Sequence, residues 1–264
     1  AGALAAAKLH IPVAHVEAGL RSFNRRMPEE INRIVADHVA SLLLVPTKTA
    51  LDNLRREGID DNLIRLVGDV MYDATIHFGQ VAQERSTILK ELQLTSGGYL
   101  LATVHRAENT DNLERLRAIF TALCTIAQKL PVVLPLHPRT RAVLEKAGLM
   151  TEVTSSLCIT APLGYLDMLM LERNAALIAT DSGGVQKEAF FSRVPCVTLR
   201  DETEWVELVA AGWNRLAPPT STENIVEAVK AALASGKVMP KPDDIYGRGD
   251  AAWRIVEALA ELKK

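Results

Sequence analysis

Short apolar runs with the composition of β-strands alternate with amphipathic helical stretches along the whole 264-residue chain. Most of these runs are continuously apolar, as strands are when helices cover both faces of a sheet. Strict alternation of this kind predicts an α/β fold with doubly wound parallel sheets. The predicted strands are Pro12–Val16, Leu42–Val45, Leu63–Val67, Tyr99–Val104, Val132–Leu136, Leu157–Thr160, Ala176–Thr180, Cys196–Leu199 and Arg215–Ala217. The predicted helices include Tyr72–Leu92, Asn112–Lys129, Thr222–Ala234 and Ala251–Leu262.

A polar, glycine-rich segment at Leu94–Gly98 interrupts this pattern and is the one candidate domain boundary in the sequence. Enough strands follow it for a complete doubly wound domain, whereas the strands before it would bury too little apolar surface on their own. The sequence therefore predicts that residues 1–94 form the rear part of one domain together with a connecting helix. Residues 95–249 form a second, complete domain, and residues 250–264 form a helix that packs back toward the first.

Bulk composition excludes several classes of partner. The formal net charge is −2 and no basic stripe is present, which argues against binding to nucleic acid or to an anionic membrane. No apolar stretch reaches the roughly 18 residues that a transmembrane helix needs. The cysteines Cys124, Cys158 and Cys196 are isolated from one another, which predicts buried, reduced thiols in a cytoplasmic protein. The six histidines form no HxH or HExxH pattern, so no metal site is expected.

Polar side chains gather where predicted strands end. Ligands of open parallel sheets bind just outside the carboxyl ends of the strands, so these positions predict a site. They are Glu17, His105-Arg106, His137-Pro138-Arg139, Asp181-Ser182-Gly183-Gly184 and Arg200-Asp201-Glu202.

The turn 181–184 is the most informative of these strand ends, because it precedes a helix predicted to begin near Val185. Glycines allow a ligand to approach the backbone, and the N–H groups at a helix start favour an anion. Glu188, one turn later, suits the paired hydroxyls of a ribose. The alternative is a tight turn with Ser182 as N-cap and Glu188 complementing the helix dipole; the neighbouring polar strand ends favour the anion site.

His105 and Arg106 follow an apolar strand, where a histidine can donate to a phosphate and an arginine can clamp it. The alternative is a solvent-facing loop. His137 has the same two interpretations, since Pro138 and Arg139 also suit the start of a helix.

Carboxylates form the second candidate group. Pro28 suits the first position of a helix, which puts Glu29 and Glu30 in its first turn. These acids either stabilise the helix dipole, or one of them works with Glu17 as an acid/base pair on a sugar. The sequence leaves both interpretations open.

Taken together, the motifs resemble the non-hydrolysing UDP-N-acetylglucosamine 2-epimerases. The matching stretches are His15–Ser22, Met27–Arg33, Thr103–Asn109, Leu136–Pro138 and Thr180–Ala189. The resemblance implies a GT-B-like fold, with two Rossmann-like domains around a cleft, the first domain incomplete and UDP held mainly by the second. It also implies interconversion of UDP-GlcNAc and UDP-ManNAc for surface-polysaccharide precursors, by anti elimination of UDP to a 2-acetamidoglucal and re-addition with C2 inverted.

The same resemblance implies roles for individual residues. Glu17 and Glu29 would be the acid/base carboxylates, and His105 a third catalytic residue on the diphosphate side. Substrate binding would fall to Arg21, Arg106, His137, Asp181, Ser182, Gly183, Gly184 and Glu188, with the ribose on Glu188 and a second, activating UDP-sugar near Arg106 and His137. No metal or redox cofactor is implied, and relatives of this kind are usually homodimers.

Two departures from the family pattern bear on activity and substrate. Family members carry Gly-Thr-Arg-Pro-like and Gly-Asp-Thr motifs upstream of the position of Ala1, so the 264 residues alone are expected to be inactive. The stretches 22–26 and 200–207 resemble an archaeal-like branch of the family and relatives that epimerise UDP-2,3-diacetamido-glucuronate. Arg25 and Arg26 either meet a C6 carboxylate or form a solvated loop, and the loop is favoured. A GT-B glycosyltransferase and a non-catalytic UDP-sugar-binding module stay open as alternatives.

Overall fold

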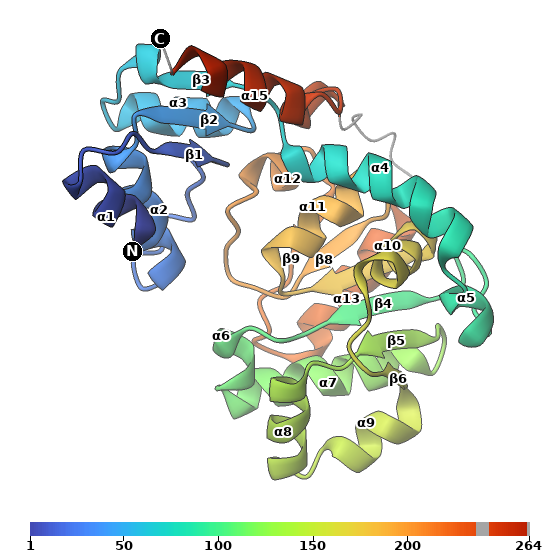
Figure 1. Cartoon of the computed structure of the whole chain (residues 1–264). Coiled ribbons are helices and arrows are strands. Elements are labelled where there is room, and N and C mark those ends of the chain that lie inside the picture. Colours follow the sequence, from blue (N-terminus) through green and yellow to red (C-terminus); the bar gives the residue numbers. More distant parts are fainter. Residues whose placement is uncertain (236–242, 263–264) are drawn as a thin grey trace. The chain divides into compact units, whose positions relative to one another are not determined.

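The structure, a computed structural model, describes residues 1–235 and 243–262 and confirms the α/β class (Figure 1). The chain divides into two compact units. Unit 1 comprises Ala1–Ile76 and Pro240–Lys264, and unit 2 comprises His77–Met239. The division falls within helix α4 (Val70–Arg85), whereas the sequence favours a seam at residues 94–98. Lys263 and Lys264, the end of the predicted C-terminal segment 250–264, lie outside the described residues.

Unit 1 contains a parallel sheet in the order β1-β2-β3. Its strands are β1 (Ala14–Val16), β2 (Leu42–Val45) and β3 (Ile64–Leu66). Its helices are α1 (Gly2–Lys8), α2 (Pro28–Val39), α3 (Lys48–Arg56), the 3-10 turn Asp61–Leu63, the start of α4, α14 (Asp243–Tyr246) and α15 (Ala251–Glu261). The central strand β2 is buried along its whole length. Ile255 and Ala258 of α15 pack against Leu42 and Leu44, so the C-terminal helix belongs to the core of unit 1.

Unit 2 contains a six-stranded parallel sheet in the order β6-β5-β4-β7-β8-β9 (Figure 1). Its strands are β4 (Leu100–Thr103), β5 (Val132–Pro135), β6 (Cys158–Thr160), β7 (Leu177–Thr180), β8 (Cys196–Thr198) and β9 (Asn214–Leu216). Numbered within the unit, this is the order 3-2-1-4-5-6 of Rossmann folds, whose direction of winding reverses between β4 and β7. Ligands of such sheets bind at this reversal, outside the carboxyl ends of the strands.

Helices cover both faces of the unit 2 sheet, as its continuously apolar strands predict. One face packs against α7 (Leu113–Ala127) and α13 (Thr222–Ala234), with Phe120 and Ile225 in the core. The other packs against α10 (Tyr165–Asn174) and α11 (Gly183–Phe191), with Leu171 and Ala189 in the core. The remaining helices of unit 2 are α5 (Ile88–Glu91), α6 (Ala107–Thr110), α8 (Pro138–Lys146), α9 (Met150–Ser156) and α12 (Val206–Ala210).

All nine predicted strands are present, with ends that differ by at most two residues, as at Pro12 predicted and Ala14 observed. The single helix predicted over 72–92 is wrong, because α4 ends at Arg85 and α5 begins at Ile88. In the break between the two helices, the hydroxyl of Ser86 donates to Asp167 at 2.6 Å, while its N–H still donates to the Ala82 carbonyl at 2.9 Å.

The cysteines are free thiols, but only Cys124 and Cys196 are buried, whereas Cys158 is half-buried. Burial raises the pKa of the Cys196 thiol to about 12.

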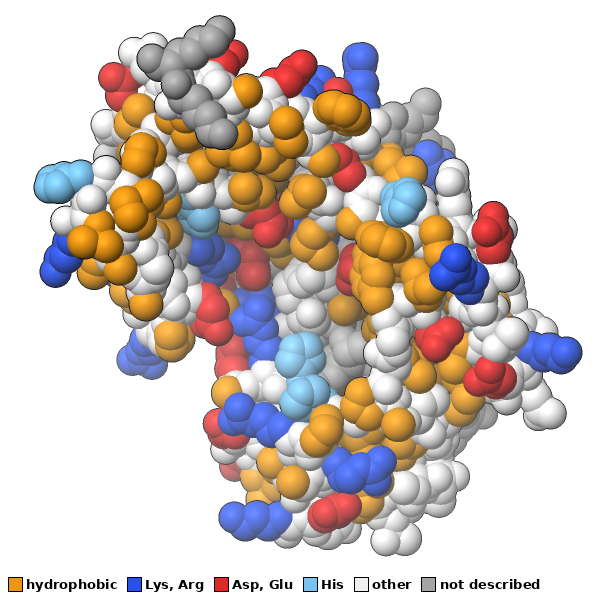
Figure 2. Space-filling view, viewed as in Figure 1, with side chains coloured by type: hydrophobic (Ala, Val, Ile, Leu, Met, Phe, Trp, Pro, Cys, Tyr) orange, Lys and Arg blue, Asp and Glu red, His pale blue; other side chains and the backbone are white. Residues whose placement is uncertain are grey.

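Acidic and basic side chains are interspersed over the face of the molecule in Figure 2. Among the described helices, none has the length and apolar character to cross a membrane.

Candidate functional site at the carboxyl ends of the strands

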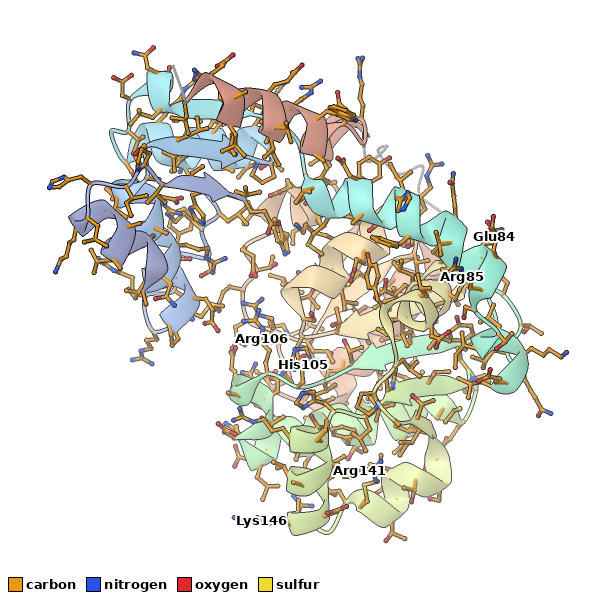
Figure 3. The ribbon with its side chains drawn as sticks, in the orientation of Figure 1. Glu84, Arg85, His105, Arg106, Arg141 and Lys146 are labelled. Carbon is orange, nitrogen blue, oxygen red and sulfur yellow. The ribbon has the colours of Figure 1, made fainter. Side chains whose placement is uncertain are left out.

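The reversal point of unit 2 brings two predicted polar strand ends together. Thr103, the last residue of β4, pairs with Thr180, the last of β7, and their hydroxyls share a hydrogen bond of 2.5 Å. The loop that begins at His105 and the turn that begins at Asp181 therefore leave the sheet side by side. Figure 3 shows His105 and Arg106 at this end of β4, whereas Arg85 lies at the far end of unit 2.

Asp181 organises this loop. Its side chain is fully buried. One carboxylate accepts the backbone N–H groups of His105 and Arg106, each at 3.1 Å, and the side-chain amide of Asn109 at 3.0 Å. The His105 Nδ1 atom lies 3.5 Å from the same carboxylate. Asp181, predicted to bind substrate, therefore holds the 105–109 loop in place instead of presenting a free carboxylate to a ligand.

Helix α11 begins at Gly183, two residues earlier than predicted, and Ser182 is its N-cap residue. The Ser182 side chain makes no capping hydrogen bond, and its own N–H donates to the Thr180 hydroxyl at 2.9 Å. The first N–H groups of a helix have no acceptor within the helix. The amides of Gly183, Gly184 and Val185, together with the Ser182 hydroxyl, therefore form a site suited to an anion.

Glu204 packs directly beside this helix start, a feature that the sequence did not reveal. A Cβ atom on Gly183 would lie 2.6 Å from Glu204 Oε1, so a larger residue here would require the Glu204 side chain to move. The other carboxylate oxygen pairs with the buried Arg200 at 2.9 Å, and Arg106 lies 3.8 Å from Oε1. Burial alone would raise the pKa of Glu204, but Arg200 and then Arg106 hold it below its usual value. The four-residue spacing of Arg200 and Glu204 after a predicted strand was the only signal of this pair.

His105 and His137 line a cavity of about 170 Å³ at the same edge of the sheet. Their ring centroids are 5.9 Å apart. His137 caps α8, which begins at Pro138 as predicted, and its Nδ1 accepts the Arg139 N–H at 3.2 Å. A neutral imidazole that accepts at Nδ1 carries its proton on Nε2, so His137 can donate to an anion. Apolar side chains, including Leu163 and Val185, complete the lining.

Glu188, predicted to hold a ribose, lies on α11 and is 9% exposed. Burial raises the pKa of Glu188, and the positive charge of Lys187 only partly offsets this effect. Glu172 on the neighbouring α10 is fully buried, and burial together with the Glu188 carboxylate raises its pKa well above the usual value. Burial and the neighbouring carboxylate therefore both favour the neutral form of Glu172 in the folded protein.

The raised pKa of Glu172 makes stability depend on pH. A carboxyl group whose pKa is higher in the folded than in the unfolded state adds stability below the unfolded value, and this contribution is lost as pH rises through the folded pKa. Glu172→Gln, which mimics the neutral acid, should flatten this decline on the alkaline side. Urea unfolding from pH 5 to pH 9 measures it. Parallel pH curves for the variant and the wild type would contradict the assignment.

Glu17 of unit 1 follows β1 in a tight turn. Its backbone is left-handed, with φ of +61°, a conformation that non-glycine residues adopt at a cost of about 1–2 kcal/mol. Gly19 in the same turn has φ of +79° and lies against helix α3. Four other described non-glycine residues, His10, Phe23, Gln93 and Arg193, share a positive φ, so the catalytic role of Glu17 stays a prediction.

Arg21, predicted to bind substrate, is only 2% exposed. Its guanidinium donates to both carboxylate oxygens of Glu57, at 2.7 and 2.8 Å, to Asp37 at 2.7 Å and to the Leu20 carbonyl at 2.8 Å. These contacts occupy most of its donors, so the geometry assigns Arg21 to the architecture of the turn.

The adjacent acids Glu29 and Glu30 differ sharply in environment. Glu30 is 1% exposed and accepts hydrogen bonds from the N–H and hydroxyl of Ser22 and from the Phe23 N–H, at 2.9–3.1 Å. Glu29 is exposed in the first turn of α2. Of the two, only Glu29 presents its carboxylate to solvent, so Glu29 is the candidate for chemistry.

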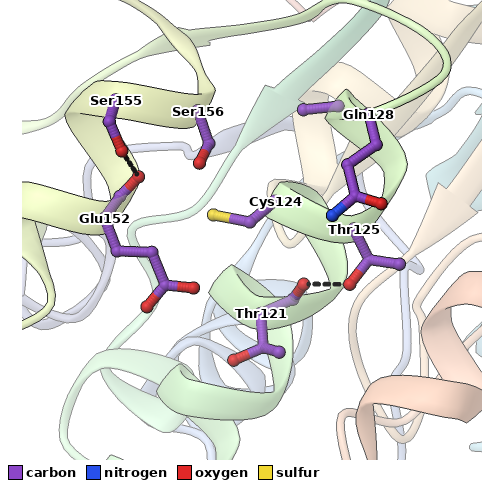
Figure 4. A pocket seen from close by; sticks show the side chains of 8 residues that line it. Thr121, Cys124, Thr125, Gln128, Glu152, Ser155 and Ser156 are labelled. Atoms are coloured by element: carbon purple, nitrogen blue, oxygen red, sulfur yellow. Dashed lines mark hydrogen bonds between the residues drawn. The ribbon is translucent and has the colours of Figure 1, made fainter.

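Another cavity, of about 360 Å³, lies between the carboxyl-terminal half of α7 and helix α9 (Figure 4). Helix α7 runs back from the carboxyl end of β4, so this cavity lies away from the edge at which Rossmann-type sheets bind ligands. It is lined mainly by Thr, Ser, Gln and Glu side chains.

In the described part of the chain, no group of three or more His, Cys, Asp or Glu residues is placed to hold a metal ion.

Known proteins match the chain over nearly its whole length. The family model described as UDP-N-acetylglucosamine 2-epimerase matches residues 1–260. A UDP-2,3-diacetamido-2,3-dideoxy-D-glucuronate 2-epimerase of Pseudomonas aeruginosa is 51% identical over 99% of this chain and 72% of its own length. A UDP-N-acetylglucosamine 2-epimerase of Methanocaldococcus jannaschii is 44% identical over 98% of this chain and 71% of its own.

Solved structures agree. The crystal structure of the Methanocaldococcus jannaschii enzyme in complex with UDP-GlcNAc and UDP covers 98% of this chain with a TM-score of 0.90, and 72% of that structure is matched. The Neisseria meningitidis enzyme bound to UDP-GlcNAc, at 30% identity, covers 98% of this chain and 72% of its own with a TM-score of 0.84. The expected GT-B-like fold class is confirmed by these matches, and the chain belongs to the UDP-N-acetylglucosamine 2-epimerase family.

Proposed function

We propose that the protein is a UDP-N-acetylglucosamine 2-epimerase, an isomerase that interconverts UDP-GlcNAc and UDP-ManNAc. The observation that carries the proposal is the anion site at the start of α11, flanked by His105, Arg106 and His137, in a chain of this family. A nucleoside diphosphate offers the negative charge that such a helix start attracts.

Unit 2 binds the nucleotide in this proposal. The Ser182 hydroxyl and the Gly183 and Gly184 amides hold the diphosphate, with His105 donating to it. The cavity that His105 and His137 line is otherwise bounded mainly by apolar side chains, which suits the nucleoside. Glu188 accepts the ribose hydroxyls. A second UDP-sugar would bind as activator near Arg106 and His137 in the same proposal.

Unit 1 supplies the acid/base groups. A carboxylate removes the C2 proton while the C1–O bond to UDP breaks, which leaves a 2-acetamidoglucal and free UDP. In the return step a proton is delivered to the opposite face of C2 as UDP adds back to C1. Glu17 and Glu29 take these two roles, one as base and the other as acid, exchanged in the reverse direction. Overall, no atom or electron is gained or lost.

The runner-up substrate is UDP-2,3-diacetamido-2,3-dideoxy-glucuronate. The observation in its favour is the 51% identity to the Pseudomonas aeruginosa enzyme named for that substrate, against 44% for the Methanocaldococcus jannaschii enzyme. Arg25 and Arg26 are exposed just before α2 and carry charge opposite to that of a C6 carboxylate. The elimination and re-addition at C1 and C2 would be the same.

Full-length protein incubated in D₂O with each sugar tests the proposal. Epimerisation through C2 deprotonation should place deuterium at C2 of the product, which ¹H NMR detects. The sugar with the higher kcat/KM identifies the substrate. Exchange with neither sugar, or transfer of the sugar to an acceptor without exchange as in a glycosyltransferase, would refute it. The further proposals are that the protein is a homodimer and that it is cytoplasmic. Sedimentation of the same sample tests the first, and cell fractionation tests the second.

A further inference from the structure

Asp37 joins the turn that carries Glu17 to the helix that carries Glu29. It lies on α2, about two turns after Glu29, and is 1% exposed. Its carboxylate accepts three hydrogen bonds from the segment that includes Glu17: His15 Nδ1 at 2.6 Å, the Gly19 N–H at 3.1 Å and Arg21 at 2.7 Å. A single carboxylate therefore holds residues on both sides of Glu17.

The three hydrogen bonds of Asp37 form a clamp on the Glu17 turn, and the conformation of this turn requires one. Left-handed backbone at a non-glycine residue persists only where its surroundings enforce it. Asp37 fixes His15 before Glu17 and Gly19 after it, and the Ala18 N–H bonds to the Leu44 carbonyl of β2 at 3.2 Å. Without the Asp37 contacts the turn could relax to a right-handed backbone, which would redirect the Glu17 side chain.

Helix α2 fixes the loop that follows as well. Glu30, at the start of the helix, binds Ser22 and Phe23, while Asp37, near its end, binds Gly19 and Arg21. The Glu17 turn and α2 are thereby tied at two points. Since Glu29 lies on α2, these contacts fix the backbone that carries Glu17 relative to the helix that carries Glu29.

We propose that Asp37 is a positioning residue that sets the placement of the Glu17 carboxylate relative to Glu29 through the turn that it clamps. The proposal rests on the epimerase function proposed above. A displacement of about 1 Å in a reacting group can lower a rate by about 10²-fold, so loss of the clamp should slow turnover. Nucleotide binding is assigned to unit 2, so the affinity for UDP should not change.

The variant Asp37→Asn makes a specific change. The side-chain oxygen that faces Gly19 and Arg21 must still accept, because both of those groups are donors. The new NH₂ group then faces His15 Nδ1 and forces that nitrogen to become an acceptor. The imidazole proton should move from Nδ1 to Nε2, a change that ¹H–¹⁵N NMR of the histidine ring reports directly.

Steady-state kinetics with UDP-GlcNAc and UDP-2,3-diacetamido-2,3-dideoxy-glucuronate gives the second measurement. We expect Asp37→Asn to lower kcat by about 10²-fold with little change in KM or in UDP affinity by calorimetry. Glu57→Gln is the matched control, because Glu57 holds the outer side of Arg21 without contacting Gly19 or His15. It should leave kcat close to the wild-type value. A wild-type kcat in Asp37→Asn, or an equal loss in Glu57→Gln, overturns the proposal.

A second pair of variants applies if Asp37→Asn does not fold, as judged by circular dichroism. His15→Gln keeps a donor for Asp37 and His15→Phe removes it. The proposal expects kcat to be higher in the Gln variant, and equal values overturn it. Failure of the proposed function is a separate outcome, seen as a wild-type protein that turns over neither sugar. The NMR measurement still decides whether Asp37 sets the His15 tautomer.

Discussion

Glu29→Gln should lower the rate of epimerisation by about 10²- to 10⁴-fold, the range that general acid–base groups contribute. Its carboxylate is exposed in the first turn of α2, so the neutral amide should fit without disturbing the fold. The affinity for UDP should stay close to that of the wild type, because the nucleotide contacts are assigned to unit 2. Kinetics by NMR and calorimetry with UDP measure the two quantities separately.

Glu30→Gln is the matched control for this prediction. The buried carboxylate of Glu30 accepts three hydrogen bonds from Ser22 and Phe23, and an amide NH₂ in its place would face a donor. The free energy of unfolding should fall by about 1–3 kcal/mol, whereas Glu29→Gln should leave it unchanged. Loss of stability in Glu29→Gln, or full activity in that variant, would contradict the division of roles between the two acids.

Gly19→Ala should lower the free energy of unfolding by about 3 kcal/mol or more. The backbone at Gly19 has φ of +79°, and an added Cβ would lie 2.3 Å from the Ala50 carbonyl oxygen and 3.0 Å from Leu54 Cγ. Ala50 and Leu54 are buried in α3, so they cannot shift without disturbing the packing of that helix. The Glu17 turn would have to move, so activity should be lost as well. Urea unfolding and kcat measure the two effects.

Gly58→Ala separates backbone strain from the clash. Gly58 has the same φ of +79°, but nothing lies within 4 Å of an added Cβ. This variant should lose only the roughly 1–2 kcal/mol that left-handed backbone costs an L-residue. If the two alanine variants were equally stable, the close approach of Gly19 to α3 would not be a constraint on the turn.

Strand positions were predictable because their apolar runs are unbroken and the polar residues that follow mark their ends. The same pattern located His105 beside Asp181, since strand ends of a parallel sheet meet at one edge. The roles of the individual residues at that edge were harder to predict from the sequence. The sequence around Asp181 does not show whether its carboxylate faces a ligand or accepts hydrogen bonds from the His105 and Arg106 amides. The two cases differ only in the orientation of the side chain.

Long-range pairs account for what the sequence could not reveal. Glu204 reaches Gly183 and Arg106 from a different loop, and Arg21 is occupied by Asp37 and Glu57. Such contacts join residues far apart in the chain, so no local pattern records them. Ser86, between α4 and α5, likewise bonds to a residue distant in the chain, Asp167 on α10.

The buried carboxylate of Asp181 has a consequence for the thermodynamics of ligand capture. Its hydrogen bonds to the 105–109 loop are made within the protein, so the loop is ordered before a nucleotide arrives. The entropy of ordering that loop is then lost during folding and not on association, which favours tighter binding for the same contacts. In the proposed function, part of the affinity for the nucleotide is therefore determined when unit 2 folds, before binding.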